Sequence, residues 1–298
     1  MEALFALTFP IGKLALRYAG VLTLIGVRMT LAGSLMLFYH YFFVRVRRSV
    51  PSKDWLLFAQ TTLFYVYLAF VPEFWALKSI SSLKSNMLWS SLPFISALFG
   101  FYLCNERLTR SKWAGVLIGV CGMMPVIFVM EPQEALWGNF FHITVADCLM
   151  TVAVVSTAYG LFLVKMLMQK GYSLIFINGF TMLSGGLMCL ATRLFYGITE
   201  QHAFQFWPLF GYILLLIAVS NFAGYAIYGY LLRFYSITFL SLAGFLCPLF
   251  GAVFGKLILN EHFHYQYVIA FSCVVAGLIL FAYDDLIVLS KGKGLIDD

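Results

Sequence analysis

Long runs of apolar residues set the strongest limit on what this chain can fold into. A transmembrane helix needs about 20 mainly apolar residues to cross the hydrocarbon core of a bilayer. Short polar gaps separate the runs, so the pattern predicts an all-α integral membrane protein with ten transmembrane helices. The predicted spans are 1–16, 20–44, 55–77, 79–104, 113–130, 143–164, 174–195, 209–232, 237–259 and 267–287.

The overall composition agrees with a membrane protein. Hydrophobic residues make up 62% of the chain and charged residues 11%, against about 45–50% and about 25% in soluble domains. The net charge of +6 does not indicate nucleic acid, because the basic residues lie in the short gaps between apolar runs. We therefore expect a lipid bilayer and a small molecule as partners, and no nucleic acid.

Cofactor and metal motifs are missing from the sequence. The six cysteines form no C-x-x-C pair, which argues against a zinc site or a disulfide framework. The two histidines of "HFH" (262–264) are too few for a closed metal site. No Walker lysine loop is found, so ATP-driven pumping is not supported. We expect no cofactor and no metal.

The lysines and arginines predict an orientation, since cytoplasmic loops are enriched in them. If the N-terminus is cytoplasmic, the inside loops hold twelve of the nineteen basic residues, the outside loops three, and the spans four. Both termini are therefore predicted to be cytoplasmic.

One stretch of the chain is nearly repeated. "LPFISALFGFYLCNE" (92–106) and "CPLFGAVFGKLILNE" (247–261) share six of fifteen positions, with a constant offset of 155 residues. We interpret residues 1–298 as one membrane domain of two five-helix repeats, 1–130 and 143–287. Because five is odd, the second repeat would be inverted in the membrane, an architecture that many alternating-access transporters use.

Several stretches also resemble a known family. These are "TFPIGK" (8–13), "VRMTLAG" (27–33), residues 76–122 and their second copy, residues 231–277. The chain resembles the EamA-type carriers of the drug/metabolite transporter superfamily. The resemblance implies a ten-helix carrier that moves a small metabolite through a central cavity. Within that family, amino acids and nucleoside-containing compounds such as S-adenosylmethionine are candidate substrates. Relative to Lys165, Lys13 lies close to its helix start, so we expect the first span to be short, about 24 Å.

Charged residues inside spans are costly and therefore candidates for function. On the predicted topology they all lie toward the outer ends of their helices, which suggests an outward-open vestibule for a substrate with both signs of charge. They are Lys13, Arg28, Glu73, Lys84, Asp147, Lys256 and Glu261. For Lys256 and Glu261 we favour simple snorkelling to the interface. For Lys84 and Glu73, two interpretations remain open: they contribute to the vestibule, or they form an ion pair with each other.

Uncharged polar and aromatic residues occupy the predicted middle of the membrane. Such residues are typical of small-molecule sites, although Ser, Thr and Asn also act as packing contacts between helices. The predicted substrate-binding residues are Tyr65, Asn86, Trp89, Ser90, Tyr159, Asn221, Tyr225 and Ser241. Pro93 and Pro248 occupy twin positions within spans, where we expect kinks that serve as hinges.

The sequence thus predicts a secondary transporter of a bacterial inner membrane that carries a small polar metabolite by alternating access. The main alternative is an intramembrane lipid-modifying enzyme of acyltransferase type, because His142 and Asp147 have H-x4-D spacing. A passive channel is a third alternative. A homodimer is compatible with the sequence.

Overall fold

A computed structural model of the chain describes residues 1–43, 50–104, 109–127, 139–140, 143–196, 205–224, 227, 230–231, 246–261 and 265–290. The elements of its first part are α1 (Glu2–Ala15), α2 (Val21–Phe43), the 3-10 turn η1 (Ser52–Asp54), α3 (Trp55–Thr61), the π-helix η2 (Thr62–Tyr67), α4 (Leu68–Leu77), α5 (Ser82–Trp89), α6 (Leu92–Cys104) and α7 (Arg110–Ile127).

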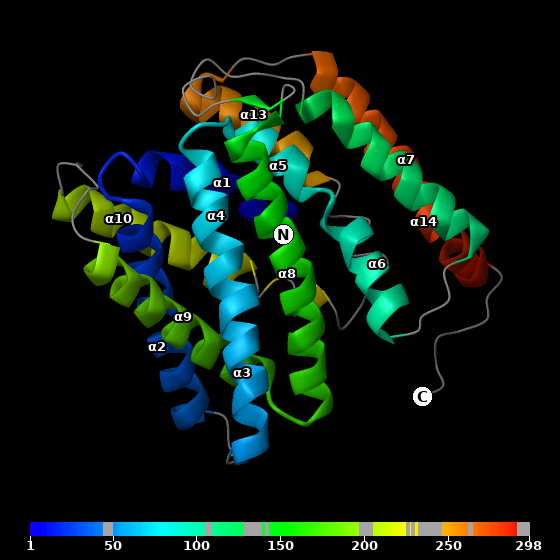
Figure 1. The fold of residues 1–298 in the computed structure, drawn as a ribbon. Helices are drawn as coiled ribbons and strands as arrows, with labels where there is room; N and C mark the ends of the chain where they lie inside the picture. The colour runs from blue at the N-terminus through cyan, green and yellow to red at the C-terminus, as the bar shows by residue number, and fades with distance from the viewer. Residues whose placement is uncertain are drawn as a thin grey trace.

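The second part begins with a short antiparallel pair, in which Asn139 lies opposite Thr144. After this pair, the described ranges are again mainly helical (Figure 1). The elements are β1 (Asn139–Phe140), β2 (Ile143–Thr144), α8 (Val145–Gln169), α9 (Leu174–Tyr196), α10 (Phe206–Leu216), the π-helix η4 (Ile217–Gly224), α13 (Leu246–Leu259) and α14 (Tyr265–Ser290).

Six helical segments in the described ranges are long and apolar enough to cross a membrane, so the prediction of an all-α, multi-span protein is confirmed. They are Val21–Phe43, Ser52–Leu77, Ser82–Leu103, Val145–Gln169, Leu174–Phe195 and Trp207–Gly224. Two shorter apolar helices, Leu246–Leu259 and Tyr265–Phe281, add to them. The count of ten remains a prediction.

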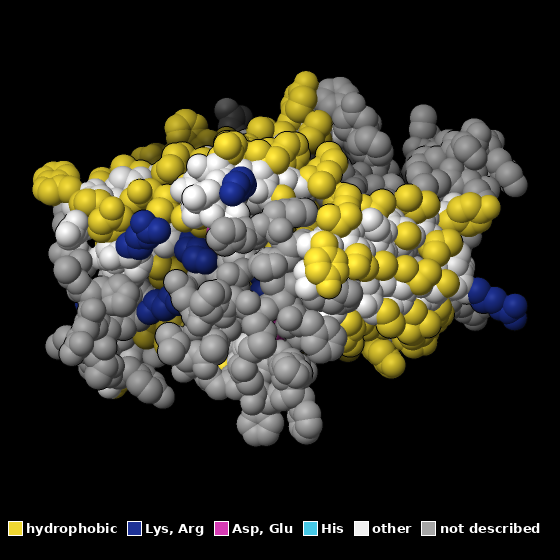
Figure 2. All heavy atoms as spheres, turned by 90° about the horizontal axis from the view of Figure 1, so that it is seen from above, with side chains coloured by type: hydrophobic (Ala, Val, Ile, Leu, Met, Phe, Trp, Pro, Cys, Tyr) yellow, Lys and Arg dark blue, Asp and Glu magenta, His cyan; other side chains and the backbone are white. Residues whose placement is uncertain are grey.

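Large hydrophobic side chains cover much of the outside. Leu194, Phe195 and Trp207 are more than three-quarters exposed, which would be unfavourable in water but is expected against lipid. Figure 2, which views the molecule from above, shows hydrophobic side chains over most of the described surface and a group of Lys and Arg side chains on part of this end. The buried core comprises Phe9, Leu24, Met29, Phe58, Val66, Leu77 and Met150.

Glycines bring α2 and α9 into close antiparallel contact. A Cβ atom built on Gly33 would lie 2.7 Å from the Gly179 carbonyl oxygen, and one on Gly26 would lie 3.3 Å from that of Gly186. Within each helix, the two glycines are seven residues apart, which is about two helical turns. Small residues at this spacing let two membrane helices approach along one stripe.

A second antiparallel pair, α7 and α14, runs along one side of the molecule (Figure 1). Here a Cβ on Gly115 would lie 2.3 Å from the Gly277 carbonyl oxygen. Between the two pairs, α8 packs against α4 and α6, and α1 packs against α13 and η4. These helices carry five of the candidate site residues, namely Lys13, Glu73, Asp147, Tyr159 and Asn221.

The predicted span 79–104 is not one continuous helix. Helix α5 ends at Trp89, and α6 begins at Leu92, after a turn at Ser90 and Ser91. Pro93 therefore lies in the first turn of α6, where its missing N–H removes no helical hydrogen bond. Pro93 thus lies inside the span Ser82–Leu103, at the break between α5 and α6, and its predicted role as a hinge stays a prediction. Pro248 lies in α13, and the residues that precede Leu246 are outside the described ranges.

Two stretches of π-helix interrupt the long spans. The segment η2 connects α3 to α4, and η4 continues α10. A π-helix has hydrogen bonds from residue i to residue i+5, and such segments are frequent at functional sites. Tyr65 of η2 and Asn221 of η4 were both predicted to bind substrate, so the two unusual segments carry candidate residues.

Candidate functional site

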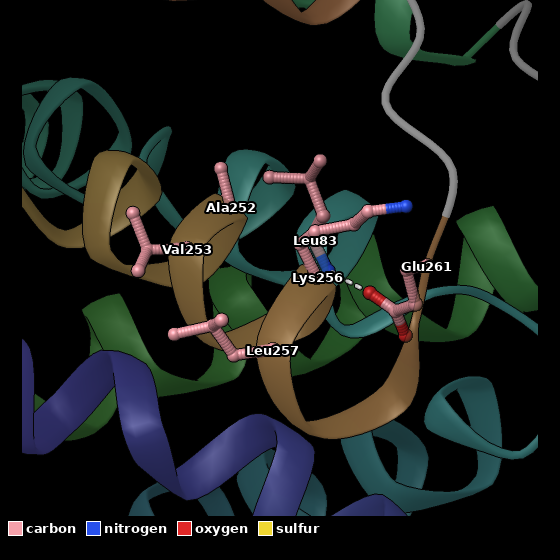
Figure 3. Close-up of a pocket in the computed structure, with 6 residues that line it drawn as sticks. All are labelled: Leu83, Ala252, Val253, Lys256, Leu257 and Glu261. Atoms are coloured by element: carbon pink, nitrogen blue, oxygen red, sulfur yellow. Dashed lines mark hydrogen bonds between the residues drawn. The ribbon is translucent and has the colours of Figure 1, made fainter.

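Glu261 joins the end of α13 to the start of α5. The chain turns through Asn260, whose φ of 54° is left-handed, and this turn directs the Glu261 side chain back toward α5. The carboxylate accepts hydrogen bonds from Ser82 N (2.7 Å), Ser82 Oγ (2.8 Å) and Leu83 N (3.2 Å). The last of these is the dashed line in Figure 3. Free N–H groups at a helix start attract an anion, so Glu261 acts as a cap supplied by another helix.

Lys13 of α1 completes this contact. Its ammonium group donates to the Ile80 carbonyl oxygen at 2.6 Å and lies 3.5 Å from Glu261 Oε1. The side chain of Glu261 is only 10% exposed. The expectation that Glu261 snorkels to the interface is therefore wrong, because two backbone N–H groups and an ammonium group compensate its burial. Lys256 is exposed, as snorkelling requires.

A pocket of about 440 Å³ lies beside the Glu261 cap. Figure 3 shows Ala252, Val253 and Leu257 of α13 along it, with Leu83 of α5 on the other side. Lys256 and Glu261 are its charged lining residues. None of the predicted substrate-binding residues lines this pocket, so it is distinct from the predicted central site.

Lys84 and Asp147 form a buried ion pair. Lys84 Nζ lies 3.0 Å from Asp147 Oδ1, with side chains 0% and 3% exposed. The other oxygen of Asp147 accepts from Thr144 N (3.1 Å) and Thr144 Oγ1 (2.7 Å), which makes a capping box at the start of α8. Lys84 thus pairs with Asp147 and not with Glu73, which corrects one of the two expectations for Lys84.

Arg28 of α2 points toward η4. One guanidinium nitrogen donates to Ser220 Oγ at 3.0 Å and to Asn221 Oδ1 at 3.4 Å. The guanidinium also lies over the ring of Phe70 in α4, 5.8 Å from its centroid. Glu73, one turn after Phe70, is buried as well. The structure therefore places a buried cation and a buried anion next to the same turn of α4.

The predicted outward-open vestibule is wrong for this conformation. Arg28, Glu73, Lys84 and Asp147 are each at most 6% exposed, and Lys13 is partly buried. Exposed charges are costly within a bilayer, so the helices close around them wherever a partner or hydrogen bond is available. The charges form separate internal clusters instead of one open rim.

Asn86 lies at the crossing of α5 and α13. Its amide donates to the Ser82 carbonyl oxygen at 3.0 Å, and Cys247 Sγ donates to its oxygen at 3.3 Å. A Cβ on Gly251 would lie 2.7 Å from the Asn86 amide. Ser90 Oγ donates to the Asn86 carbonyl oxygen at 3.0 Å. In this conformation Asn86 packs against α13, while Ser90 bonds back to the preceding turn of its own segment.

The predicted aromatic residues occupy separate positions. Tyr159 of α8 lies among Phe64 and Phe99, with ring centroids 4.9 and 5.8 Å away. Trp89 meets the edge of Phe9 at 6.1 Å, and Tyr65 packs against Gly160, where α8 crosses η2. Tyr225 and Ser241 lie outside the described residues, as does His142.

Comparisons with known proteins agree with this fold. The model of the "EamA-like transporter family" matches residues 2–128 and 144–283. The chain belongs to the EamA-like transporter family. A crystal structure with 15% sequence identity superposes with a TM-score of 0.64 and covers 98% of both chains, so it shares the fold.

Relatives of this EamA-like protein include named transporters. The "S-adenosylmethionine/S-adenosylhomocysteine transporter" of Chlamydia muridarum is 27% identical over 93% of this chain and 88% of its own. Its counterpart from Chlamydia trachomatis serovar D is 26% identical over 93% of this chain and 85% of its own. The "Uncharacterized transporter YetK" of Bacillus subtilis is 24% identical over 91% and 81%. The protein is thus a multi-pass membrane transporter.

The enzyme alternative is excluded by family membership. The geometry of the EamA-like chain agrees, because Asp147 uses both carboxylate oxygens, one for Lys84 and one for Thr144. An acyltransferase would need this carboxylate to orient a catalytic base instead. The H-x4-D spacing of residues 142–147 therefore reflects a helix start.

Some contributing residues escaped the sequence analysis of this EamA-like protein. Ser82 was not singled out, although consecutive serines ahead of an apolar run are a helix-start signal. Phe70 could have been found as the residue one turn before Glu73 on the same helix face. Cys247 was not singled out either, although its thiol donates to Asn86. No sequence signal marks that contact.

Replacing Glu261 with alanine is expected to destabilise the protein by about 2 kcal/mol, because the start of α5 loses its cap and Lys13 loses its anion. Thermal unfolding of the detergent-purified protein measures the effect. Lys256→Met on the same helix is the matched control, since its side chain is exposed. Equal stability of the Glu261→Ala and control variants would contradict the capping role.

Proposed function

We propose that this chain exchanges S-adenosylmethionine for S-adenosylhomocysteine across a bacterial inner membrane. The observation that carries the proposal is the similarity, over 93% of the chain, to chlamydial transporters named for these two compounds. Both compounds join an adenosine to an amino-acid group. The candidate site offers aromatic rings and buried charges, which are the kinds of group that such a molecule requires.

We further propose that transport uses two inverted five-helix repeats, 1–130 and 143–287, within one membrane domain. The family model matches each part separately. The π-helices η2 and η4 begin at Thr62 and Ile217, which are 155 residues apart, the same offset as in the repeated sequence. An unusual backbone at matching positions supports a duplicated unit.

The contacts between helices also support the inverted repeats. The contact of α1 with η4 corresponds to that of α8 with η2, and the contact of α1 with α13 corresponds to that of α8 with α6. The pairs α2 with α9 and α7 with α14 each join an element to its own counterpart. If each element is replaced by its counterpart in the other repeat, these contacts are found again. Such a pattern is expected when a pseudo-twofold axis relates the two repeats.

For the binding site we propose the residues singled out above, now in two groups. Tyr65, Asn86, Trp89, Ser90 and Tyr159 would line the nucleoside part, together with Tyr225 and Ser241. Asn221 would hold Arg28 in place, as its hydrogen bond suggests. Asn86 and Ser90 would exchange their helix contacts for substrate when α5 and α13 separate.

Exchange by purified protein in liposomes tests the proposed function. Vesicles loaded with unlabelled S-adenosylhomocysteine should take up labelled S-adenosylmethionine saturably, several-fold faster than empty vesicles do. Methionine and adenosine serve as competitors that each carry half of the substrate. Lack of uptake into loaded vesicles would contradict the proposal, and unsaturable uptake would indicate a passive channel.

We also propose that both termini are cytoplasmic. In a cysteine-free background, a cysteine at exposed Arg17 should react with an impermeant maleimide from outside intact cells. A cysteine at exposed Lys53 should react only after the cells are opened. The reverse pattern would contradict the predicted orientation. The homodimer stays a prediction, which cross-linking in the membrane can test.

A further inference from the structure

The buried carboxylate of Glu73 stands out from the other charges in the bundle. Its side chain is 6% exposed, and its Oε2 atom accepts no hydrogen bond from any residue that the structure describes. A buried carboxylate without a donor is strongly disfavoured unless a cation or donor reaches it during function. Asp147 and Glu261, by contrast, each have an ammonium group and hydrogen-bond donors beside them.

Arg28 reaches the same region from α2, which packs against both α4 and η4. It belongs to α2 and is 2% exposed, and its contacts with Ser220 and Asn221 come from η4. The Ser220 hydroxyl and the Asn221 amide oxygen are neutral acceptors that orient the guanidinium. Five N–H donors in a planar fork are suited to bind a carboxylate through two bonds.

The contact with Phe70 brings these two charges to one place. The Arg28 guanidinium lies over the Phe70 ring, and Phe70 and Glu73 share one face of α4 because they are three residues apart. The cation therefore belongs to the α2–η4 side and the anion to the α4 side. A ligand bound between the two groups of helices would contact both.

We propose that Arg28 and Glu73 form the subsite for the α-amino-acid end of the substrate. The substrate carboxylate binds the Arg28 guanidinium, and the substrate ammonium group binds the Glu73 carboxylate. This inference rests on the proposed function, because S-adenosylmethionine and S-adenosylhomocysteine both carry this zwitterionic group. The bound zwitterion would satisfy the Glu73 oxygen that lacks a donor and would bridge the two helix groups.

Substrate analogues test the subsite in the unchanged protein. S-adenosylhomocysteine, its decarboxylated analogue and its desamino analogue differ only in the groups that Arg28 and Glu73 would bind. Titration calorimetry of the detergent-purified protein should show about 10- to 100-fold weaker binding for each analogue, since each lacks one charge-assisted contact. Equal affinity for all three compounds would overturn the proposal.

Variants then assign each charge to its residue. Arg28→Gln should bind S-adenosylhomocysteine and the decarboxylated analogue equally, while it still discriminates against the desamino analogue. Glu73→Gln should show the opposite pattern. Arg17→Gln, at an exposed position, is the matched control and should keep both preferences. A uniform loss of affinity for all compounds in both variants would indicate a structural role and would overturn the assignment.

5′-Methylthioadenosine, which lacks the whole amino-acid end, separates the two proposals. If the unchanged protein binds this compound as tightly as S-adenosylhomocysteine, the subsite is wrong but the proposed function stands. If the unchanged protein binds none of the adenosyl compounds, the proposed function fails, and the subsite fails with it.

Discussion

Replacing Lys84 with methionine is expected to destabilise the protein by about 3–5 kcal/mol, because the change leaves the Asp147 carboxylate buried without its cation. Methionine keeps the length and the apolar stem of lysine, so packing changes little. The measurement is thermal unfolding of the detergent-purified protein, followed by fluorescence-detected size exclusion. This is the largest stability effect that we expect from any single charged residue in the chain.

A double variant separates the charge from the helix cap. In Lys84→Met/Asp147→Asn both charges are gone, but the asparagine oxygen can still accept from Thr144 N. Replacing both members of a buried pair costs less than removing one, so the double variant should regain much of the lost stability. Lys53→Met, at an exposed position, controls for the loss of a lysine. A double variant as unstable as Lys84→Met would show that the ion pair is not the cause.

Replacing Gly33 with alanine is expected to cost about 1–3 kcal/mol, because the new methyl group overpacks the contact between α2 and α9. Its Cβ atom would lie 2.4 Å from Leu183 N and 2.7 Å from the Gly179 carbonyl oxygen. Both are backbone atoms, which cannot turn aside as a flexible side chain can. The two helices must therefore move apart, and transport should fall together with stability.

Gly211 provides the matched control for this prediction. A Cβ atom at Gly211 would meet no atom within 4 Å, and alanine is the better helix former by about 1 kcal/mol. Gly211→Ala should therefore be neutral or slightly stabilising in the same unfolding assay. If Gly33→Ala is equally neutral, the close approach of α2 and α9 described above is wrong.

The spans could be predicted from the sequence because about 20 apolar residues are a physical requirement of the bilayer. The first residues of α2 and α9 accordingly lie within about one residue of the predicted ones. The break between α5 and α6 was missed, since Ser90 and Ser91 are polar but do not interrupt the hydropathy. The π-helices were also missed, because the register of backbone hydrogen bonds leaves no trace in hydropathy.

The candidate site was predictable only in part. Lys84 and Asp147 were each identified as candidates because they are charged residues within predicted spans. Their pairing could not be predicted, because the two residues are 63 positions apart and meet only where α5 packs against α8. Glu261 was interpreted as an interfacial residue because the sequence cannot show that its turn faces the start of α5. Residue type and hydropathy thus indicated which side chains matter, while partner choice required the packing.

The opposite charges of Arg28 and Glu73 have a consequence for energy coupling. In the proposed exchange they cancel, so a site that held S-adenosylhomocysteine would be neutral overall, whereas one that held S-adenosylmethionine would keep the positive charge of the sulfonium. Each exchange would then move one positive charge across the bilayer, which the membrane potential drives by about 2.3 kcal/mol per 100 mV. In a membrane that is negative inside, the voltage itself would favour entry of the methyl donor and release of its product, without a coupling ion.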